Sequence, residues 1–289
     1  KLALHEGVPA EQILCGNGAA DLIFRLVWAK KPRRALVTAP TFAEYATALE
    51  SIGCTVERFF LREQEDFAVT GAICAAIRPG VDMVFLCQPN NPTGQLTALP
   101  LVEQILRRCA ACGTLLVVDE CFLDFLPDHA LHTAKGLLGE GNLVILKAFT
   151  KLYGMAGVRL GYALSADTAL LEQMQACGQP WGVSSLAQAA GLAALEETAY
   201  VEKVRALIAE QRPRLTAGLR ALGLRVLDGR ANYLLFQAPE TLGEALRQRG
   251  AVLRSCANYP GLGPGWYRTA VRTGPENEQL LKLLAEVLE

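Results

Sequence analysis

The sequence has almost no surplus of either charge, since its 28 Lys and Arg residues are matched by 29 Asp and Glu residues. A net charge of −1 argues against the broad basic face that binding to a phosphate backbone requires. The chain also lacks an apolar run of membrane-spanning length, and its N-terminus has neither the basic start nor the cleavage site of a signal peptide. We therefore expect no nucleic-acid partner, no membrane partner and a cytoplasmic location.

Metal-ligand spacing is missing from the nine cysteines. Cys109 and Cys112 form the one close C-x-x-C pair, on an expected helix, with no second pair or histidine cluster to complete a site. The odd number of cysteines and their scatter indicate reduced cytosolic thiols rather than a disulfide or zinc framework. The sequence therefore predicts no bound metal.

Internal repeats, low-complexity tracts and long polar linkers are absent as well. Hydrophobic residues make up 51% of the 289 residues, which is ample material for a buried core. A chain of this length suits a large and a small domain, which we place at residues 1–198 and 199–289. Because the chain opens at Lys1, without an initiator Met and inside an expected helix end, we also expect an N-terminal segment to be missing.

Short apolar runs alternate with helical stretches through the first two-thirds of the chain. The runs are brief and rich in Leu and β-branched residues, which is typical of strands buried on both faces. The expected strands are residues 35–38, 83–87, 114–118, 143–147 and 160–164. Helix formers with apolar residues three to four apart lie between them, at residues 19–29, 43–52, 99–111 and 169–176. This alternation predicts an α/β fold, a three-layer sandwich with a mostly parallel sheet.

The pattern changes after about residue 200. A long expected helix, 201–222, contains Pro213, which predicts a break or a kink. Two further strands, 233–237 and 267–272, bracket a short helix at 242–249, and residues 275–288 form a closing helix. The sequence therefore predicts a smaller α+β domain at the C-terminal end.

Two glycine-containing loops are candidates for ligand binding, because ligands of open α/β sheets collect beyond the carboxyl ends of the strands. Residues 16–21, Gly-Asn-Gly-Ala-Ala-Asp, precede the first helix, where small residues let backbone N–H groups approach a phosphate. A purely structural turn is the alternative. Residues 88–94 contain two prolines and a glycine, so they form a rigid turn that can aim Asn91 at a ligand. An ordinary Asx-type turn is the alternative there.

Two charged side chains follow buried strands. Asp119 ends one strand, where a carboxylate is costly unless a cation such as a protonated pyridine nitrogen matches it; a backbone-capping aspartate is the alternative. Lys151 follows the next strand and is placed to lose water, which favours the neutral amine of Schiff-base chemistry, although a solvated lysine is the alternative. Thr150 and Arg159 offer a hydroxyl and a guanidinium suited to phosphate.

Taken together, these motifs resemble the fold-type I pyridoxal-phosphate aminotransferases of the aspartate aminotransferase superfamily, above all the histidinol-phosphate aminotransferase branch. The resemblance runs from about Gly7 to the C-terminus, and its motifs are Gly16-Asn17-Gly18, Pro40-Thr41-Phe42, Asn90-Asn91-Pro92-Thr93-Gly94, Asp119-Glu120 and Thr150-Lys151 with Arg159. It implies that pyridoxal 5′-phosphate is the cofactor. It also implies a homodimer with shared active sites, in which the N-terminal part reaches the neighbouring subunit.

The resemblance assigns roles to individual residues. Lys151 would hold the cofactor as a Schiff base and then move protons, and Asp119 would pair with the ring nitrogen, as the catalytic residues. The other implied cofactor contacts are the backbone of Gly18, Ala19 and Ala20, with Thr150 and Arg159, at the phosphate, Phe42 on the ring face and Asn91 at the ring oxygen. Arg268 would clamp a substrate carboxylate or phosphate, with a surface strand arginine as the alternative.

Two positions depart from the family pattern. Phe122 stands where many relatives have a tyrosine that touches the ring oxygen, and Ala148 stands where many have a hydroxyl residue near the phosphate. The segment 254–262, Arg-Ser-Cys-Ala-Asn-Tyr-Pro-Gly-Leu, resembles instead the threonine-phosphate decarboxylases of cobalamin biosynthesis, a sister group. That likeness implies a small phosphorylated amino acid as substrate, with Arg268 and Arg254 fixing its acidic groups.

Three functions are compatible with the sequence. The preferred interpretation is decarboxylation of L-threonine O-3-phosphate, and the alternative is transamination of histidinol phosphate or another amino acid. In both reactions the substrate amine is bound to the cofactor, and the bond held perpendicular to the cofactor ring is the one that breaks, so the orientation of the substrate decides the reaction. The third is the effector-sensing domain of a transcription regulator built on an aminotransferase scaffold.

Overall fold

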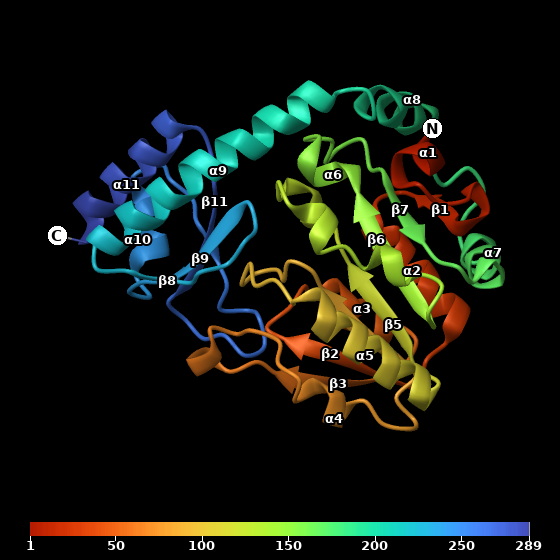
Figure 1. The fold of residues 1–289 in the computed structure, drawn as a ribbon. Helices are drawn as coiled ribbons and strands as arrows, with labels where there is room; N and C mark the ends of the chain where they lie inside the picture. Colours follow the sequence, from red (N-terminus) through yellow and green to blue (C-terminus); the bar gives the residue numbers. More distant parts are fainter. Residues whose placement is uncertain (289) are drawn as a thin grey trace.

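The larger of two sheets has seven strands and runs through the centre of the molecule. The structure is a computed structural model that describes residues 1–288 (Figure 1). The strand order is β1-β7-β6-β5-β4-β2-β3. The strands are β1 (Ile13–Gly16), β2 (Arg34–Ala39), β3 (Thr55–Phe60), β4 (Met83–Cys87), β5 (Leu115–Asp119), β6 (Leu143–Ala148) and β7 (Gly161–Leu164). The pairs among β2 to β6 are parallel, whereas β7 runs against both of its neighbours.

Helices cover both faces of this sheet. One face carries α2 (Ala19–Lys30), α3 (Glu44–Glu50) and α7 (Thr168–Ala176), and the other carries α4 (Ile73–Ala76), α5 (Leu99–Cys112) and α8 (Ser185–Ala194). Side chains alternate between the two cores along each strand, so that Phe85 packs on one face while Val84 and Leu86 pack on the other. The predicted three-layer α/β sandwich with a mostly parallel sheet is confirmed.

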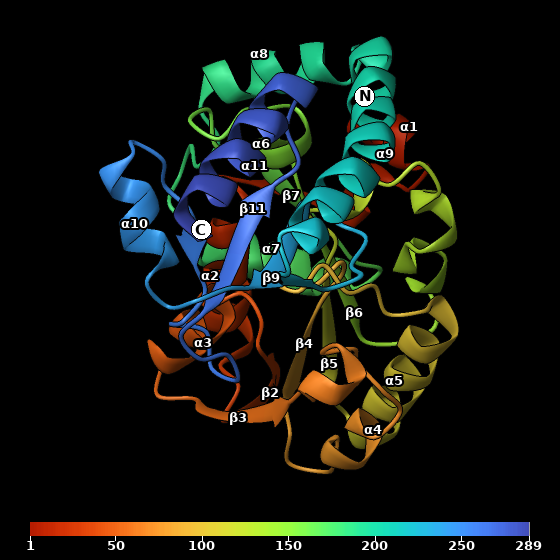
Figure 2. The ribbon, with the colours of Figure 1, turned by 90° about the vertical axis from the view of Figure 1, so that its left-hand side faces the viewer.

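A second sheet of four strands forms a smaller α+β unit at the C-terminal end, as predicted. Its antiparallel order is β10-β11-β9-β8. These strands are β8 (Arg225–Val226), β9 (Tyr233–Gln237), β10 (Arg254–Ser255) and β11 (Trp266–Ala270). With them pack α10 (Leu242–Gln248) and α11 (Gly274–Leu288). Figure 2 views the molecule from the side of the small unit, which therefore lies in front of the large sheet.

The long helix α9 (Thr198–Ala221) leads from α8 at one end of the molecule to the small unit at the other (Figure 1). Pro213 lies inside it, so of the two predicted outcomes, a break or a kink, the break is wrong. Val201 and Ile208 are buried before the proline, and Leu215 and Leu219 are buried after it. We attribute the continuity of the helix to packing on both sides of the proline, which offsets the hydrogen bond that proline removes. No helix within residues 1–288 is long and apolar enough to cross a membrane.

Candidate active site

A cavity of about 170 Å³ lies at the carboxyl ends of β4, β5 and β6, next to the start of α2. Ligands of open parallel sheets collect at this edge. The cavity is lined by Ala19, Ala20, Phe42, Cys87, Asn91, Asp119, Cys121, Phe122, Ala148, Thr150, Lys151 and Arg159. All the predicted cofactor contacts except Gly18 thus line the cavity. Phe122 and Ala148, the two positions that depart from the family pattern, line it as well.

Gly18 lies just behind this wall and shapes it. Its φ of 82° suits glycine, and a Cβ there would lie 2.6 Å from Nη2 of Arg159, so the guanidinium approaches only because the side chain is absent. Arg159 itself has the left-handed φ of 63°. On the other side, a Cβ at Gly161 of β7 would lie 2.6 Å from the backbone N of Ala19. Close packing thus places a guanidinium beside a helix N-terminus, an arrangement that favours an anion.

Asp119 is a buried carboxylate, 5% exposed, at the end of β5. Tyr45 donates its hydroxyl hydrogen to Oδ2 over 2.5 Å, and the backbone N–H of Cys121 donates to Oδ1 over 3.0 Å. Burial, reinforced by the charge of Asp119, raises the pKa of Tyr45 well above 10. Tyr45 is therefore a donor at every physiological pH, and its hydroxyl fixes the direction of the Asp119 carboxyl group.

Sequence reasoning missed Tyr45, although a signal was present. It follows Phe42 by three residues, which is about one turn at the start of α3. The two rings meet edge to face with centroids 5.5 Å apart. Phe42 lines the cavity while Tyr45 is fully buried beneath it. A tyrosine one turn after an expected ring-stacking residue can support the floor of the same site.

Lys151 lies on the short helix α6 (Phe149–Leu152), directly after β6. Its Nζ is 5.5 Å from the ring centroid of Phe122. The residue is exposed, so the expectation that Lys151 is desolvated is wrong: its side chain extends from a short helix turn at the surface. Thr150 next to it is buried. The amine therefore reaches the cavity from its solvent side, where a ligand would cover it.

Two groups from the small unit meet the cavity at Asn91. Arg268 of β11 donates to Asn91 Oδ1, and the hydroxyl of Tyr259 lies 3.5 Å from the same oxygen. The guanidinium of Arg268 also stacks 5.0 Å from the ring centroid of Tyr233. The structure thus brings Arg268, 177 residues away in sequence, to the cavity edge. Tyr259 is a second contact to which sequence reasoning assigned no role.

Arg254 lies outside this contact. It pairs with Arg268 across β10 and β11, yet its side chain is exposed and donates to Asn258 Oδ1 over 3.0 Å. Its guanidinium lies 5.5 Å from the ring centroid of Tyr259. Of the two arginines expected to bind substrate, Arg268 thus reaches the cavity edge, while Arg254 stands one strand farther out.

The polar groups around the cavity fit a phosphorylated pyridine aldehyde. A helix N-terminus, Thr150 and Arg159 suit a phosphate, and the buried carboxylate of Asp119 suits a protonated ring nitrogen. Phe42 offers an aromatic face, and Lys151 offers a primary amine for the aldehyde. Each reactive part of such a cofactor therefore has a matching group in the cavity wall.

Comparison with known proteins agrees with this fit. The family model described as "Aminotransferase class I and II" matches residues 4–287. The chain belongs to the class I and II aminotransferase family. Members of this family depend on pyridoxal phosphate, so the predicted cofactor and the prediction of a pyridoxal-phosphate-dependent enzyme are confirmed.

Two curated relatives of the chain carry the names of two different reactions. The chain is 40% identical over 291 residues to the threonine-phosphate decarboxylase of Salmonella typhimurium, covering 99% of this chain and 80% of that protein. It is 36% identical over 295 residues to the histidinol-phosphate aminotransferase of Symbiobacterium thermophilum, covering 100% and 79%. These similarities confirm the predicted branch of the family.

Similar solved structures include both an aminotransferase and a decarboxylase. The histidinol-phosphate aminotransferase from Clostridium acetobutylicum superposes with a TM-score of 0.93 at 25% identity, covering 99% of this chain and 86% of that one. A decarboxylase from Sulfurospirillum multivorans superposes with a TM-score of 0.91 at 26% identity, covering 100% and 85%. The fold-type I architecture is therefore common to relatives of both reactions.

Proposed function

We propose that the protein decarboxylates L-threonine O-3-phosphate to an aminopropanol phosphate, as a step of cobalamin biosynthesis. The observation that carries this proposal is the 40% identity to a threonine-phosphate decarboxylase over 99% of the chain. The decarboxylase-like segment 254–262 supports it, because its Tyr259 lies against Asn91 at the cavity edge.

The proposed roles of the cavity residues follow from their positions. Bound pyridoxal phosphate supplies an electron sink for the bond that breaks at the substrate α-carbon. Lys151 would hold the cofactor through Nζ and would move protons at the substrate α-carbon during the reaction. Asp119, held by Tyr45, keeps the ring nitrogen protonated. Phe42 covers the ring face.

The remaining contacts hold the cofactor in place. We assign the phosphate to the backbone of Gly18, Ala19 and Ala20 with Thr150 and Arg159, and the ring oxygen to Asn91. Arg268 already donates to Asn91, so a substrate acid at Arg268 would lie beside the ring. Arg254, one strand farther out, is placed for the more distant acidic group of a substrate with two of them.

The test is a product assay on protein reconstituted with pyridoxal phosphate. We expect carbon dioxide and an aminopropanol phosphate from threonine phosphate, without any oxo-acid acceptor. Threonine lacking the phosphate is the matched control, and its turnover should be much slower. Absence of carbon dioxide together with transamination of histidinol phosphate would overturn the proposal.

Transamination of histidinol phosphate is the second candidate. The 36% identity to a histidinol-phosphate aminotransferase and the TM-score of 0.93 to another favour it. An aminotransferase must exchange its amino group with glutamate, so the visible absorption of the bound cofactor should disappear on adding glutamate. An absorption that glutamate leaves unchanged rejects this candidate.

We further propose a homodimeric, cytoplasmic enzyme with a cofactor-binding domain at residues 1–198 and a smaller domain at 199–289. Three exposed leucines support self-association: Leu4 on α1 (Leu2–Glu6) and Leu186 and Leu192 on α8 are 88%, 78% and 48% exposed. The two helices lie at the same end of the molecule (Figure 1). A second copy of the chain would remove these side chains from water.

A further inference from the structure

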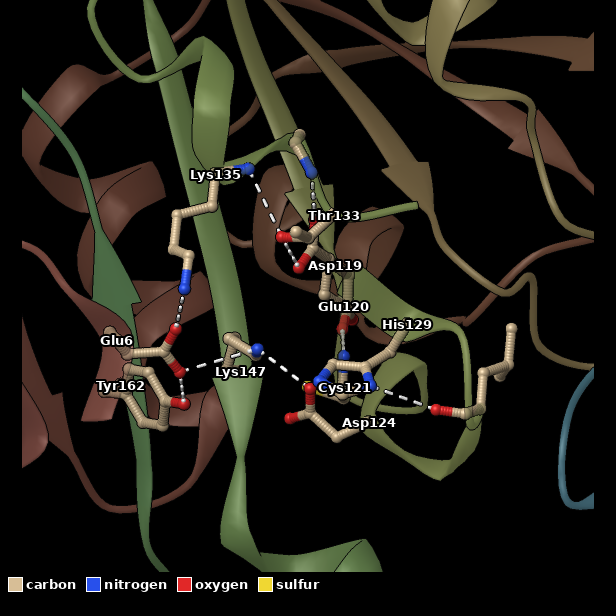
Figure 3. Close-up of polar contacts among 12 residues, drawn as sticks. Glu6, Asp119, Glu120, Cys121, Asp124, His129, Thr133, Lys135, Lys147 and Tyr162 are labelled. Carbon is tan, nitrogen blue, oxygen red and sulfur yellow. Dashed lines mark hydrogen bonds and ion pairs between the residues drawn. The ribbon is translucent and has the colours of Figure 1, made fainter. Parts of the chain in front are cut away.

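A network of buried charges lies on the reverse face of the large sheet from the cavity. Ala148 of β6 lines the cavity, so Lys147, the preceding residue, points to the opposite face. There it lies across from Tyr162 of β7 in the strand register. Figure 3 shows Lys147 between Glu6, which comes from α1, and Asp124, which follows β5.

The contacts of Lys147 are ionic on both sides. Its Nζ lies 2.9 Å from Asp124 Oδ1 and 3.5 Å from Glu6 Oε1. The side chains of Lys147 and Glu6 are 6% and 3% exposed. Glu6 also accepts hydrogen bonds from Tyr162 and, over 3.1 Å, from Lys135 (Figure 3). Two cations thus stand against the two carboxylates of Glu6 and Asp124.

Glu120 adds a third carboxylate and is completely buried. It accepts from Thr133 Oγ1 over 2.8 Å and from the backbone N–H of Ala134 over 2.7 Å. The other titratable or cationic groups whose fields reach this network are His129, Tyr153 and Arg205. Two cations therefore face three carboxylates when Glu120 is ionised, and the charges balance when it is protonated.

Stability alone does not explain this network. Removing charges from water costs several kcal/mol per ion, and apolar replacements of buried ion pairs are often more stable by about 1–4 kcal/mol. The rest of this face is packed by Ile145, Leu164 and other apolar side chains, so an apolar residue at 147 would have had suitable neighbours. A buried network in an otherwise apolar layer suggests a role beyond holding the fold.

Three members of the network, Lys147, Asp124 and Glu120, are close in sequence to residues of the candidate active site. Lys147 precedes Lys151 by four residues, and Asp124 follows Asp119 by five. The backbone N–H of Glu120 donates to Leu146 O over 2.8 Å, which joins the ends of β5 and β6. The network therefore connects the two strand ends that carry the proposed catalytic residues.

We propose that Lys147 is a positioning residue for Lys151 and Asp119. Lys147 forms ion pairs with Asp124 and Glu6, and these pairs hold the end of β6 against α1 and against the segment that follows Asp119. The charge of the network also acts across the sheet on the proton affinity of the bound cofactor. The proposal rests on the proposed attachment of the cofactor at Lys151. It does not depend on which substrate the enzyme uses.

The experiment compares Lys147→Met, Lys147→Arg and Asp124→Asn in the full chain reconstituted with pyridoxal phosphate. The readout is the pH midpoint at which the visible absorption of the bound cofactor changes, measured without substrate. Loss of the Lys147 cation leaves surplus negative charge in the network, and this charge favours the protonated form of the bound cofactor. The pH midpoint of Lys147→Met should therefore rise by about half a pH unit, which is a change of about three-fold in the proton affinity of the cofactor. Asp124→Asn should lower it, and Lys147→Arg should match the wild type.

Opposite shifts distinguish a charge effect from general disruption, which would move both midpoints in one direction. Equal midpoints in all four proteins, or shifts of the same sign in the two neutralising variants, would overturn the proposal. Asp124→Asn keeps the shape of the side chain, so its midpoint decides the matter if Lys147→Met does not fold. A wild-type protein without a borohydride-reducible absorption would instead reject the attachment at Lys151.

Discussion

At the scale of single residues, the candidate site depends on side chains that support others. Asp119 is fixed by the Tyr45 hydroxyl and by the backbone N–H of Cys121, one on each carboxylate oxygen. Both donors belong to the chain itself, so together they hold the carboxylate in one direction. A site built in this way is preorganised, and the supporting residues should matter nearly as much as those they support.

Tyr45→Phe tests this support. The change removes one hydroxyl from a fully buried ring, and a hydrogen bond to a charged group contributes about 1.5–3 kcal/mol. We expect kcat to fall about ten-fold or more, with the fold retained, because the carboxylate loses its direction. Steady-state kinetics with thermal unfolding as the control measures both. Unchanged kcat would show that the second donor, Cys121 N–H, suffices.

Glu120 gives the network a pH dependence whose sign can be worked out. Burial outweighs Lys147 and the two hydrogen bonds, and it raises the pKa of Glu120 from 4.5 to about 7. The folded state therefore binds this proton more tightly than the unfolded state. The contribution of Glu120 to stability is complete below pH 4.5 and is lost as the pH rises through about 7.

Glu120→Gln should remove that contribution, because the amide does not titrate. We expect the variant to gain about 2 kcal/mol in unfolding free energy, relative to the wild type, between pH 5 and pH 8. Urea unfolding of both proteins at the two pH values measures the difference. A difference that stays constant with pH would mean that Glu120 does not take up a proton in this range.

At the scale of elements, the start of α2 depends on Gly18 and Gly161, which allow Arg159 and strand β7 to approach its first residues closely. Gly18→Ala should strain the backbone and push Arg159 away, since a Cβ there would lie 2.6 Å from Nη2. We expect cofactor affinity to fall about ten-fold, with a stability loss of about 1 kcal/mol. Fluorescence titration with pyridoxal phosphate measures the affinity.

Gly53→Ala is the matched control for that prediction. Gly53 has a φ of 76°, close to that of Gly18, but a Cβ there would meet nothing within 4 Å. It should show the same stability loss and normal cofactor affinity. Equal cofactor affinities for both variants would contradict the proposed role of Gly18 in holding the cofactor phosphate.

Most elements with strong patterns were predictable from the sequence, and the failures have physical causes. The buried strands β4 and β9 match their predicted ranges, because four or five consecutive apolar residues suit a strand covered on both faces. Strand β3, Thr-Val-Glu-Arg-Phe-Phe, was not predicted, since it lies at the sheet edge and no residue of it is fully buried. Strand β1, at the other edge of the sheet, was not predicted either, because its apolar run of Ile-Leu-Cys is too short to stand out. Edge strands lack the apolar run on which the prediction depends.

At the scale of the whole molecule, the motifs predicted the cavity but not what surrounds it. Strand-end loops converge by the geometry of a parallel sheet, so Asn91, Asp119 and Lys151 could be placed together from sequence. The pairing of Glu6 with Lys147 spans 141 residues and depends on where α1 packs, which no local pattern specifies. Resemblance to a family indicated Arg268, yet its contact with Asn91 emerges only from the packing of two sheets.

The proposed homodimer leads to a prediction at this scale. Leu186→Lys combined with Leu192→Lys should place two charges in the apolar surface of α8 and lower self-association strongly, since charges are excluded from interface centres. Sedimentation of the wild type should give twice the mass of one chain, and the double variant should approach one chain. A Val252→Lys variant, 78% exposed on the small unit, is the control and should remain dimeric. A monomeric wild type would contradict the proposed assembly.

The assignment of Lys151 as the cofactor-bearing residue underlies every mechanistic step, and one measurement tests it directly. Borohydride reduction of the reconstituted protein fixes the cofactor to the amine that holds it, and peptide mass mapping then identifies the residue. The cavity geometry predicts a single modified peptide that contains Lys151, absent after Lys151→Ala. A cofactor fixed at another lysine, or no fixed cofactor at all, would contradict it.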